Sequence, residues 1–176
     1  DLHPRVRRQR QMCIRDRVSL AKQGGIPVIV DTSGALLAET VKAKPTMIKP
    51  NTDEIGQLLG RRVQSRQEVI DAAWELHQSG IPYVVVSLGK DGSVMACEEG
   101  IFQGITPDIP VVNTVGCGDS MVAGFAAAMA RGKGPEEMLR LATAVSTANA
   151  LTMQTGHFEQ EDLDRVLPLT AVKKIK

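Results

Sequence analysis

Short apolar runs alternate with amphipathic segments along the chain from Val18 onward. Two runs, residues 26–31 (IPVIVD) and 83–88 (YVVVSL), are continuous and rich in β-branched residues, which is typical of strands buried on both faces. Shorter strands are predicted at residues 46–49 and 109–113, and a hairpin at 93–97 and 101–105. Helices are predicted at residues 35–43, 52–59, 65–80, 118–131, 135–151 and 159–167, with the end of another at 18–22.

This alternation predicts an α/β fold. We expect a three-layer α/β/α sandwich around a mostly parallel sheet, formed by residues 18–176 as one domain. Sheets of this kind bind ligands beyond the carboxyl ends of their strands. Four polar segments follow predicted strands and therefore fall at that edge: residues 31–34, 49–54, 87–92 and 113–119.

Residues 1–17 follow a different pattern. They hold six arginines against two aspartates, they have no helical or strand period, and Pro4 interrupts them. They also lack the apolar region of a signal peptide. We interpret this segment as a non-native or disordered basic leader and leave it out of the functional argument. A basic arm that binds nucleic acid is the alternative.

Composition narrows the class of protein. The chain is 43% hydrophobic and 23% charged, as in globular proteins, but only 3% aromatic, which is low for a module that stacks bases. No apolar stretch is long enough to span a membrane. Cys13, Cys97 and Cys117 are too few and too widely spaced for a disulfide framework or a zinc site, which fits a reducing cytoplasm. We therefore expect a cytoplasmic protein that binds neither nucleic acid nor membrane.

The strongest candidate site is the segment 113–125 (NTVGCGDSMVAGF). A predicted strand runs into Gly116, Cys117 and Gly118, and a helix of small residues follows. Glycines let the backbone approach a ligand closely, and the free N–H groups of a helix start form an anion site. Asp119 could then take a proton from an attacking hydroxyl while the amides hold phosphoryl charge. The alternative is that Asp119 only stabilises the helix start and the glycines only form a tight turn.

Other chemistries fit this segment less well. A dinucleotide-binding fingerprint would need glycine at Met121, and a Walker loop would need Gly-Lys-Ser/Thr. Catalysis by the Cys117 thiol would need a base, and none of the three histidines has a motif relation to it. A small turn residue is the simpler interpretation of Cys117.

The segment 49–54 (KPNTDE) supports two interpretations. Asn51 and Glu54 have the spacing of a capping box, which starts a helix. They could also organise a hydrated magnesium ion or a phosphate, with Lys49 supplying positive charge. Both roles can hold at once.

The remaining two segments are also open to two interpretations. Ser87 could bond a nucleotide phosphate, with Gly89 and Gly92 permitting a tight loop, or residues 87–92 are an ordinary turn into the hairpin. Residues 31–34 (DTSG) read either as a polar strand end at the ligand edge or as a helix cap.

Together these motifs resemble the PfkB/ribokinase-like carbohydrate kinases, and within them the branch of 1-phosphofructokinase and tagatose-6-phosphate kinase. Residues 116–120 (GCGDS) stand where the family signature, usually GAGD, stands, with Cys117 in place of the usual alanine. Residues 49–54 look like the family's N-x-x-E element. Residues 31–34, 87–89 and 139–145 also match, so the resemblance covers nearly everything after residue 18.

The resemblance implies a ribokinase-like fold and phosphoryl transfer from ATP, with Mg²⁺, to a ketohexose phosphate. Fructose 1-phosphate, converted to fructose 1,6-bisphosphate, is the expected substrate, and tagatose 6-phosphate is the alternative. Asp119 would be the catalytic base, and the amides of Gly116, Cys117 and Gly118 the anion hole. Near the phosphates and the magnesium would lie Lys49, Asn51 and Glu54, the last through water. Near the nucleotide would lie Ser87, Gly89, Gly92 and Asn149.

The family's N-terminal half has no counterpart in this sequence. In the family that half supplies the sugar-binding acidic residues and the β-strand lid that mediates dimers. We therefore expect a C-terminal fragment that carries the ATP site and the catalytic base, is weak or inactive alone, and forms a homodimer as the full-length enzyme. A non-catalytic nucleotide- or phosphate-binding module is the rival hypothesis.

Overall fold

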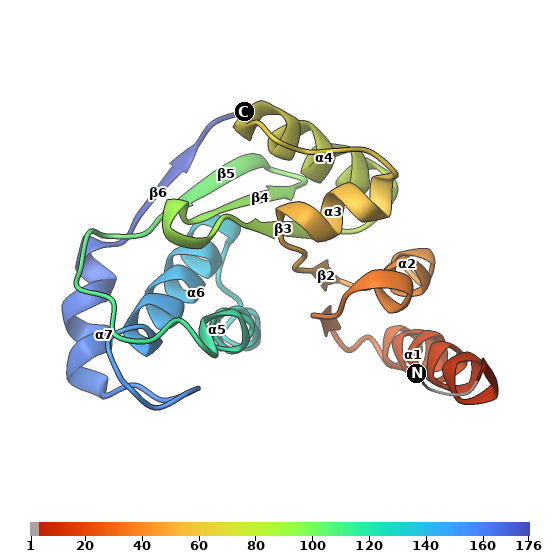
Figure 1. Ribbon diagram of the computed structural model, residues 1–176, viewed down its shortest axis with the longest axis horizontal. Coiled ribbons are helices and arrows are strands. Elements are labelled where there is room, and N and C mark those ends of the chain that lie inside the picture. The colour runs from red at the N-terminus through yellow and green to blue at the C-terminus, as the bar shows by residue number, and fades with distance from the viewer. Residues whose placement is uncertain (1–3) are drawn as a thin grey trace. The chain divides into compact units, whose positions relative to one another are not determined.

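The computed structural model describes residues 4–176, with side chains from residue 14 onward. The chain divides into two compact units, whose helices and strands are labelled in Figure 1. The first ends at Val85 and the second runs from Val86 to Lys176, so the boundary lies within β3 (Tyr83–Ser87).

The first unit alternates helices with short parallel strands. β1 (Ile29–Val30) pairs with β2 (Met47–Ile48), and β2 pairs with the start of β3, all in parallel. The helices are α1 (Pro4–Gln23), α2 (Gly34–Lys42), α3 (Thr52–Leu59) and α4 (Arg66–Gln78). The core of this unit is made of fully buried aliphatic side chains that include Leu37, Met47, Ile48, Ile55, Ile81 and Val84.

Capping boxes start both α3 and α4, and the first of them is predicted from the spacing of Asn51 and Glu54. At α3 the Asn51 side chain accepts a hydrogen bond from the Glu54 amide, and the Glu54 carboxylate accepts one from the Asn51 amide, both at 2.9 Å. Ser65 and Glu68 make the same reciprocal pair at α4. The backbone N–H of Gln64, and then that of Ser65, hold the pKa of the Glu68 carboxyl below its usual value. These bonds satisfy amides that have no partner inside the helix.

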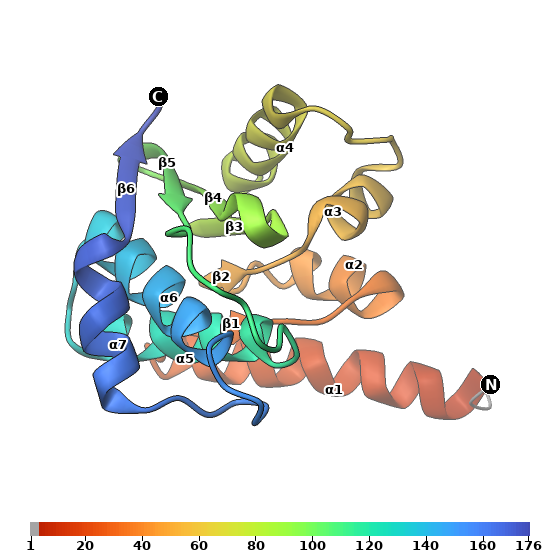
Figure 2. The ribbon, with the colours of Figure 1, turned by 60° about the vertical axis from the view of Figure 1, so that its left-hand side comes forward.

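The second unit combines an antiparallel sheet with three α-helices (Figure 2). β4 (Ser93–Cys97) and β5 (Gly100–Ile105) form a hairpin, and β6 (Ala171–Lys174) pairs antiparallel with β5. The helices are α5 (Cys117–Ala130), α6 (Pro135–Asn149) and α7 (Gln160–Val166), with short 3₁₀ turns at Gly89–Asp91 and Leu167–Leu169. Residues 106–116 connect β5 to α5 without regular structure.

Small residues let α5 and α6 pack closely. A Cβ added at Gly124 would lie 2.6 Å from the Cα of Ala142, so only glycine fits at this point of the helix pair. Phe125 and Leu139 are fully buried beside it. Because α5 carries the candidate glycine turn at its N-terminal end, this contact fixes the position of that turn relative to α6.

The α/β class and the ribokinase-like fold are confirmed, with a mixed sheet where a mostly parallel one was predicted: the strand pairs of the first unit are parallel and those of the second antiparallel. The hairpin and the helices after residue 34 lie within two residues of their predicted bounds. β1 is shorter than predicted and only half-buried. In the described residues no helix is long and apolar enough to cross a bilayer.

Three expectations need correction or extension. The strand predicted at residues 109–113 is wrong: the segment is irregular, Pro107 and Pro110 have no N–H to donate to a ladder, and Val111 and Val112 are exposed. β6 was not predicted. α1 begins at Pro4, so the helix extends well before residue 18 although the sequence shows no clear period there. That residues 1–17 are non-native stays a prediction.

Candidate functional site

The turn at Gly116 begins α5 and has a geometry that only glycine adopts easily. Gly116 is the N-cap residue, with φ 84° and ψ −4°, in the left-handed region. A Cβ added there would lie 2.8 Å from the amide nitrogen of Gly156 and 2.8 Å from the methyl carbon of Thr155. The chain therefore passes through a tight, crowded turn immediately before the helix.

The turn leaves backbone amides available for an anion. The first bond of the α5 ladder runs from the Ser120 amide to the Gly116 carbonyl, at 2.8 Å. The Cys117 amide, which the sequence predicts for the anion hole, instead donates to the Thr114 carbonyl at 3.3 Å. The amides of Gly118 and Asp119 follow it, and amides at these positions have no partner inside a helix. Within residues 14–176 no side chain caps them at Gly116. Because the positive end of the helix dipole adds to these N–H groups, the turn can hold a negatively charged ligand.

Asn149, the last residue of α6, stabilises this turn through side-chain hydrogen bonds. Its side chain is fully buried. Its amide nitrogen donates to the Val115 carbonyl at 3.0 Å and to the Cys117 sulfur at 3.3 Å, and its oxygen accepts from the Gly156 amide at 2.7 Å. The Asn149 side chain thus links the segment that precedes α5, at Val115, to the loop that contains Gly156.

Further bonds tie the same turn to α6. The Ser146 hydroxyl donates to the Cys117 carbonyl at 2.9 Å. Asn113 accepts a hydrogen bond from the Val115 amide at 3.0 Å and donates to the Met153 carbonyl at 3.1 Å. The turn is therefore held by hydrogen bonds on several sides.

A cavity of about 290 Å³ adjoins the turn within the second unit. This volume is near the lower end of the range for small-molecule sites, roughly 300–1,000 Å³. Five of the residues that the sequence predicts for the site line it: Ser87, Gly89, Gly92, Cys117 and Gly118. Ile109, Val111, Met121 and Ala150 supply apolar wall, and Thr106, Thr114, Thr143, Ser146 and Thr147 supply hydroxyls. A largely apolar pocket beside the N-terminus of a helix suits a ligand with an aromatic part and a phosphate part.

Three predicted site residues of the second unit do not line this cavity: Gly116, Asp119 and Asn149. Asp119 is exposed at the third position of α5, next to Gly118, which does line it. Asn149 lies behind the turn with its side-chain hydrogen bonds directed to the chain itself. The apolar wall at Ile109 and Val111 was missed because the sequence places these residues in a strand.

The surroundings of the two described cysteines do not favour catalysis by a thiol. Cys97 is buried in β4, and burial raises the pKa of its thiol. Cys117 is half-buried, and its sulfur accepts the hydrogen bond from Asn149. In the described part of the chain, no group of three or more His, Cys, Asp and Glu side chains is arranged to hold a metal ion directly.

In the first unit, Lys49 and Asp31 follow paired parallel strands and meet in an ion pair. Their Nζ and Oδ2 atoms are 3.1 Å apart. Asn51 and Glu54 lie in the next turn of chain and form the α3 capping box. Glu54 uses its Oε2 atom in that bond. Magnesium binds few carboxylates and keeps most of its waters, so the remaining Glu54 oxygen fits a water-mediated contact.

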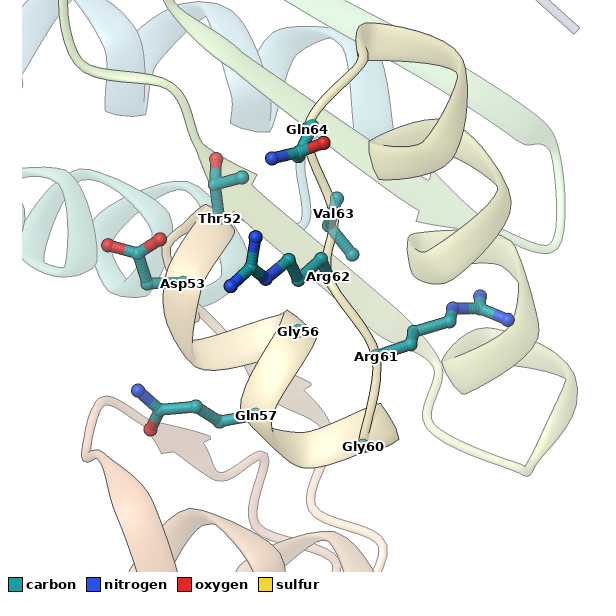
Figure 3. Close-up of a pocket in the computed structure, with 9 residues that line it drawn as sticks. All are labelled: Thr52, Asp53, Gly56, Gln57, Gly60, Arg61, Arg62, Val63 and Gln64. Carbon is teal, nitrogen blue, oxygen red and sulfur yellow. The ribbon is translucent and has the colours of Figure 1, made fainter.

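A larger cavity of about 560 Å³ lies between α3 and residues 60–64 (Figure 3). Figure 3 shows the Arg62 side chain extending toward the N-terminal turn of α3, where Thr52 and Asp53 lie. None of the predicted site residues lines this cavity. Arg61, Arg62 and Asp53 are the charged residues at its wall, and Arg61 is paired with Glu75.

We expect Asn149→Ala to lower the free energy of unfolding by about 1–3 kcal/mol, because it leaves partly buried backbone groups without partners. Asn113→Ala is the matched control: it removes an amide from the same turn, but one whose bonds are exposed, so its cost should be smaller. Urea titration of both variants measures the difference. Equal costs would contradict the role assigned to Asn149.

Comparison with known proteins identifies the class. The model of the pfkB family carbohydrate kinases matches residues 14–162. The chain therefore belongs to the pfkB family of carbohydrate kinases.

Individual members of the family that are similar to this chain include two sugar-phosphate kinases and a ribokinase. Tagatose-6-phosphate kinase from Staphylococcus epidermidis is 39% identical over 154 residues, which are 86% of this chain and 50% of the relative. Phosphofructokinase-2 from Escherichia coli, in complex with potassium, superposes with a TM-score of 0.84 at 32% identity, over 88% of this chain and 51% of that one. Ribokinase from Arabidopsis thaliana, complexed with ribose and ATP, gives a TM-score of 0.79 at 27% identity, over 89% and 52%. The chain spans about half the length of these proteins.

Proposed function

We propose that this chain carries the nucleotide-binding turn and the catalytic base of a sugar-phosphate kinase that transfers the γ-phosphoryl group of ATP to a hydroxyl of a ketohexose phosphate. The observation that carries the proposal is the Gly116 turn, with free amides at the start of α5 beside an apolar cavity. A relative named tagatose-6-phosphate kinase favours tagatose 6-phosphate as a substrate to test beside fructose 1-phosphate.

The residues of the turn suit the roles that phosphoryl transfer requires. The amides of Gly118 and Asp119 would hold charge on the transferred phosphoryl group, since fixed N–H dipoles stabilise developing negative charge. The Asp119 carboxylate would accept the proton of the attacking hydroxyl. The adenosine part of ATP would occupy the cavity lined by Ile109, Val111 and Met121. Little covalent work remains for the protein, because such transfer depends mainly on positioning and charge.

Lys49 and Glu54 belong to the first unit and would have roles of their own there. The Lys49 ammonium would attract phosphate oxygens, and Glu54 would hold a hydrated Mg²⁺ through water. Bound magnesium would neutralise phosphate charge. In the full-length protein we expect a homodimer.

The test combines binding and turnover. Isothermal titration of this chain with a non-hydrolysable ATP analogue should show binding that competes with ADP. A version that also carries the half found in the relatives should consume ATP with tagatose 6-phosphate or fructose 1-phosphate. Binding without turnover of any ketohexose phosphate would instead support a non-catalytic nucleotide-binding module, and absence of binding would refute the nucleotide site.

A further inference from the structure

Lys49 is unusual because it is a charged residue in the core. Among residues 14–176, Lys49 is the only charged residue that is buried, and 6% of its surface is exposed. Burying an ammonium group is costly unless it is paired, so lysines are almost never fully buried without a partner. A buried lysine at a strand end therefore calls for an explanation.

Strand register explains how Asp31 becomes the partner. Val30 of β1 lies opposite Ile48 of β2 in a parallel pair. Asp31 and Lys49 are the next residues of each strand, so they emerge side by side at the carboxyl edge. The Nζ–Oδ2 distance of 3.1 Å confirms the contact, and the Asp31 side chain keeps 31% of its surface exposed. Ligands of parallel sheets bind at this edge.

The pairing leaves the ammonium incompletely satisfied. A lysine ammonium has three N–H donors. Within the described residues, the Asp31 carboxylate is the ion-pair partner of Lys49, and its single oxygen at 3.1 Å can engage no more than one of those donors. Two donors on a buried cation at the ligand edge are suited to an anion with several oxygens, such as a phosphate.

We propose that Asp31 is a positioning residue that holds the Lys49 ammonium at the sheet edge so that its remaining donors bind phosphate oxygens. This inference rests on the proposed function, in which Lys49 contacts the phosphates of ATP. It adds that the contact depends on a carboxylate that itself touches no substrate.

Asp31→Glu tests positioning separately from charge, because it keeps the carboxylate and moves it by one methylene. The probe is inorganic tripolyphosphate, titrated calorimetrically into the chain at fixed ionic strength. We expect Lys49→Met to weaken binding about tenfold or more, since it removes charge-assisted hydrogen bonds, and Asp31→Glu to weaken it several-fold. In the Lys49→Met background, Asp31→Glu should have no further effect, because two residues that act as a unit are not additive.

The matched control is Glu39→Asp, which also changes a carboxylate by one methylene beside a lysine, Lys42, but in an exposed pair. It should leave the affinity unchanged. Equal effects of Asp31→Glu with and without Lys49, or no effect at all, would overturn the proposal.

A measurement on the unaltered chain covers the case in which Asp31→Glu does not fold. Carbon-detected NMR during the tripolyphosphate titration should shift the Lys49 side-chain and Asp31 carboxyl resonances together, with one dissociation constant. If neither resonance moves while tripolyphosphate binds elsewhere, the pair holds no phosphate. If tripolyphosphate does not bind at all, the proposal is also refuted. Either result leaves the nucleotide cavity of the second unit to be judged by its own titration.

Discussion

Asp119→Asn, made in a version that also carries the half found in the relatives, should lower turnover by about 10²–10⁴-fold, the usual contribution of a general base. Asparagine has nearly the same shape but cannot accept the proton of the attacking hydroxyl. The free amides of the turn are unchanged, so affinity for an ATP analogue should stay within a few-fold. A coupled ADP-release assay and calorimetry measure the two quantities.

Asp162→Asn is the control, because Asp162 occupies in α7 the third helical position that Asp119 occupies in α5. Both carboxylates favour the positive end of a helix dipole, an effect of about 0.3–1 kcal/mol. If Asp119 only stabilises its helix, both variants should leave turnover nearly unchanged; Asp162→Asn also loses an ion pair with Arg165, so turnover is the quantity to compare. Near-normal turnover of Asp119→Asn would refute its assignment as the base.

Gly116→Ala should both destabilise the protein and abolish binding of an ATP analogue. Alanine in the left-handed region costs about 1–2 kcal/mol. Its Cβ would also lie 2.8 Å from the Gly156 nitrogen, and crowding of this kind costs about 1–3 kcal/mol more. Relief of the crowding requires the chain to move at Gly116, which displaces the amides of the turn.

Gly132→Ala measures separately the loss in free energy of unfolding that comes from placing alanine at a positive φ. Gly132 also has a positive φ, of 64°, but a Cβ added there meets nothing within 4 Å. Urea unfolding should show a smaller loss for this variant, and calorimetry should show unchanged affinity for the ATP analogue. If Gly116→Ala behaves like Gly132→Ala in both measurements, the crowded turn is not part of the binding site.

Local signals made much of the fold predictable. The bounds of α3 follow from the capping box at Asn51 and from Gly60, which ends the helix in the left-handed region. The β4–β5 hairpin follows from two apolar runs joined by a short polar turn. These features depend on residues that are close in sequence, so they can be predicted from the sequence alone.

Features that depend on distant residues were not predictable. Residues 109–113 have the composition of a strand, but Pro107 and Pro110 and the bonds from Val112 and Asn113 to the Ala150 carbonyl keep them irregular. β6 forms because β5 offers an edge, which no local signal at residues 171–174 reveals.

The candidate site was predictable as a set of loops but not as a set of contacts. Five predicted residues line one cavity because the loops that carry them meet in the second unit. The placement of Asn149 behind the turn, rather than at the cavity wall, depends on its bonds to Val115 and Gly156. The ion pair of Lys49 with Asp31 depends on strand register, which neither motif contains alone.

The contact of Gly124 with Ala142 bears on how a ligand is received. Because the α5 backbone rests directly against α6, the donors at its first turn have their orientation before any nucleotide arrives. A substrate then meets dipoles that already point the right way, and no free energy of association is consumed in arranging them. A larger residue at Gly124 would push α5 away from α6. The amides at the start of α5 would then lose their fixed orientation, and each substrate would have to order them on binding.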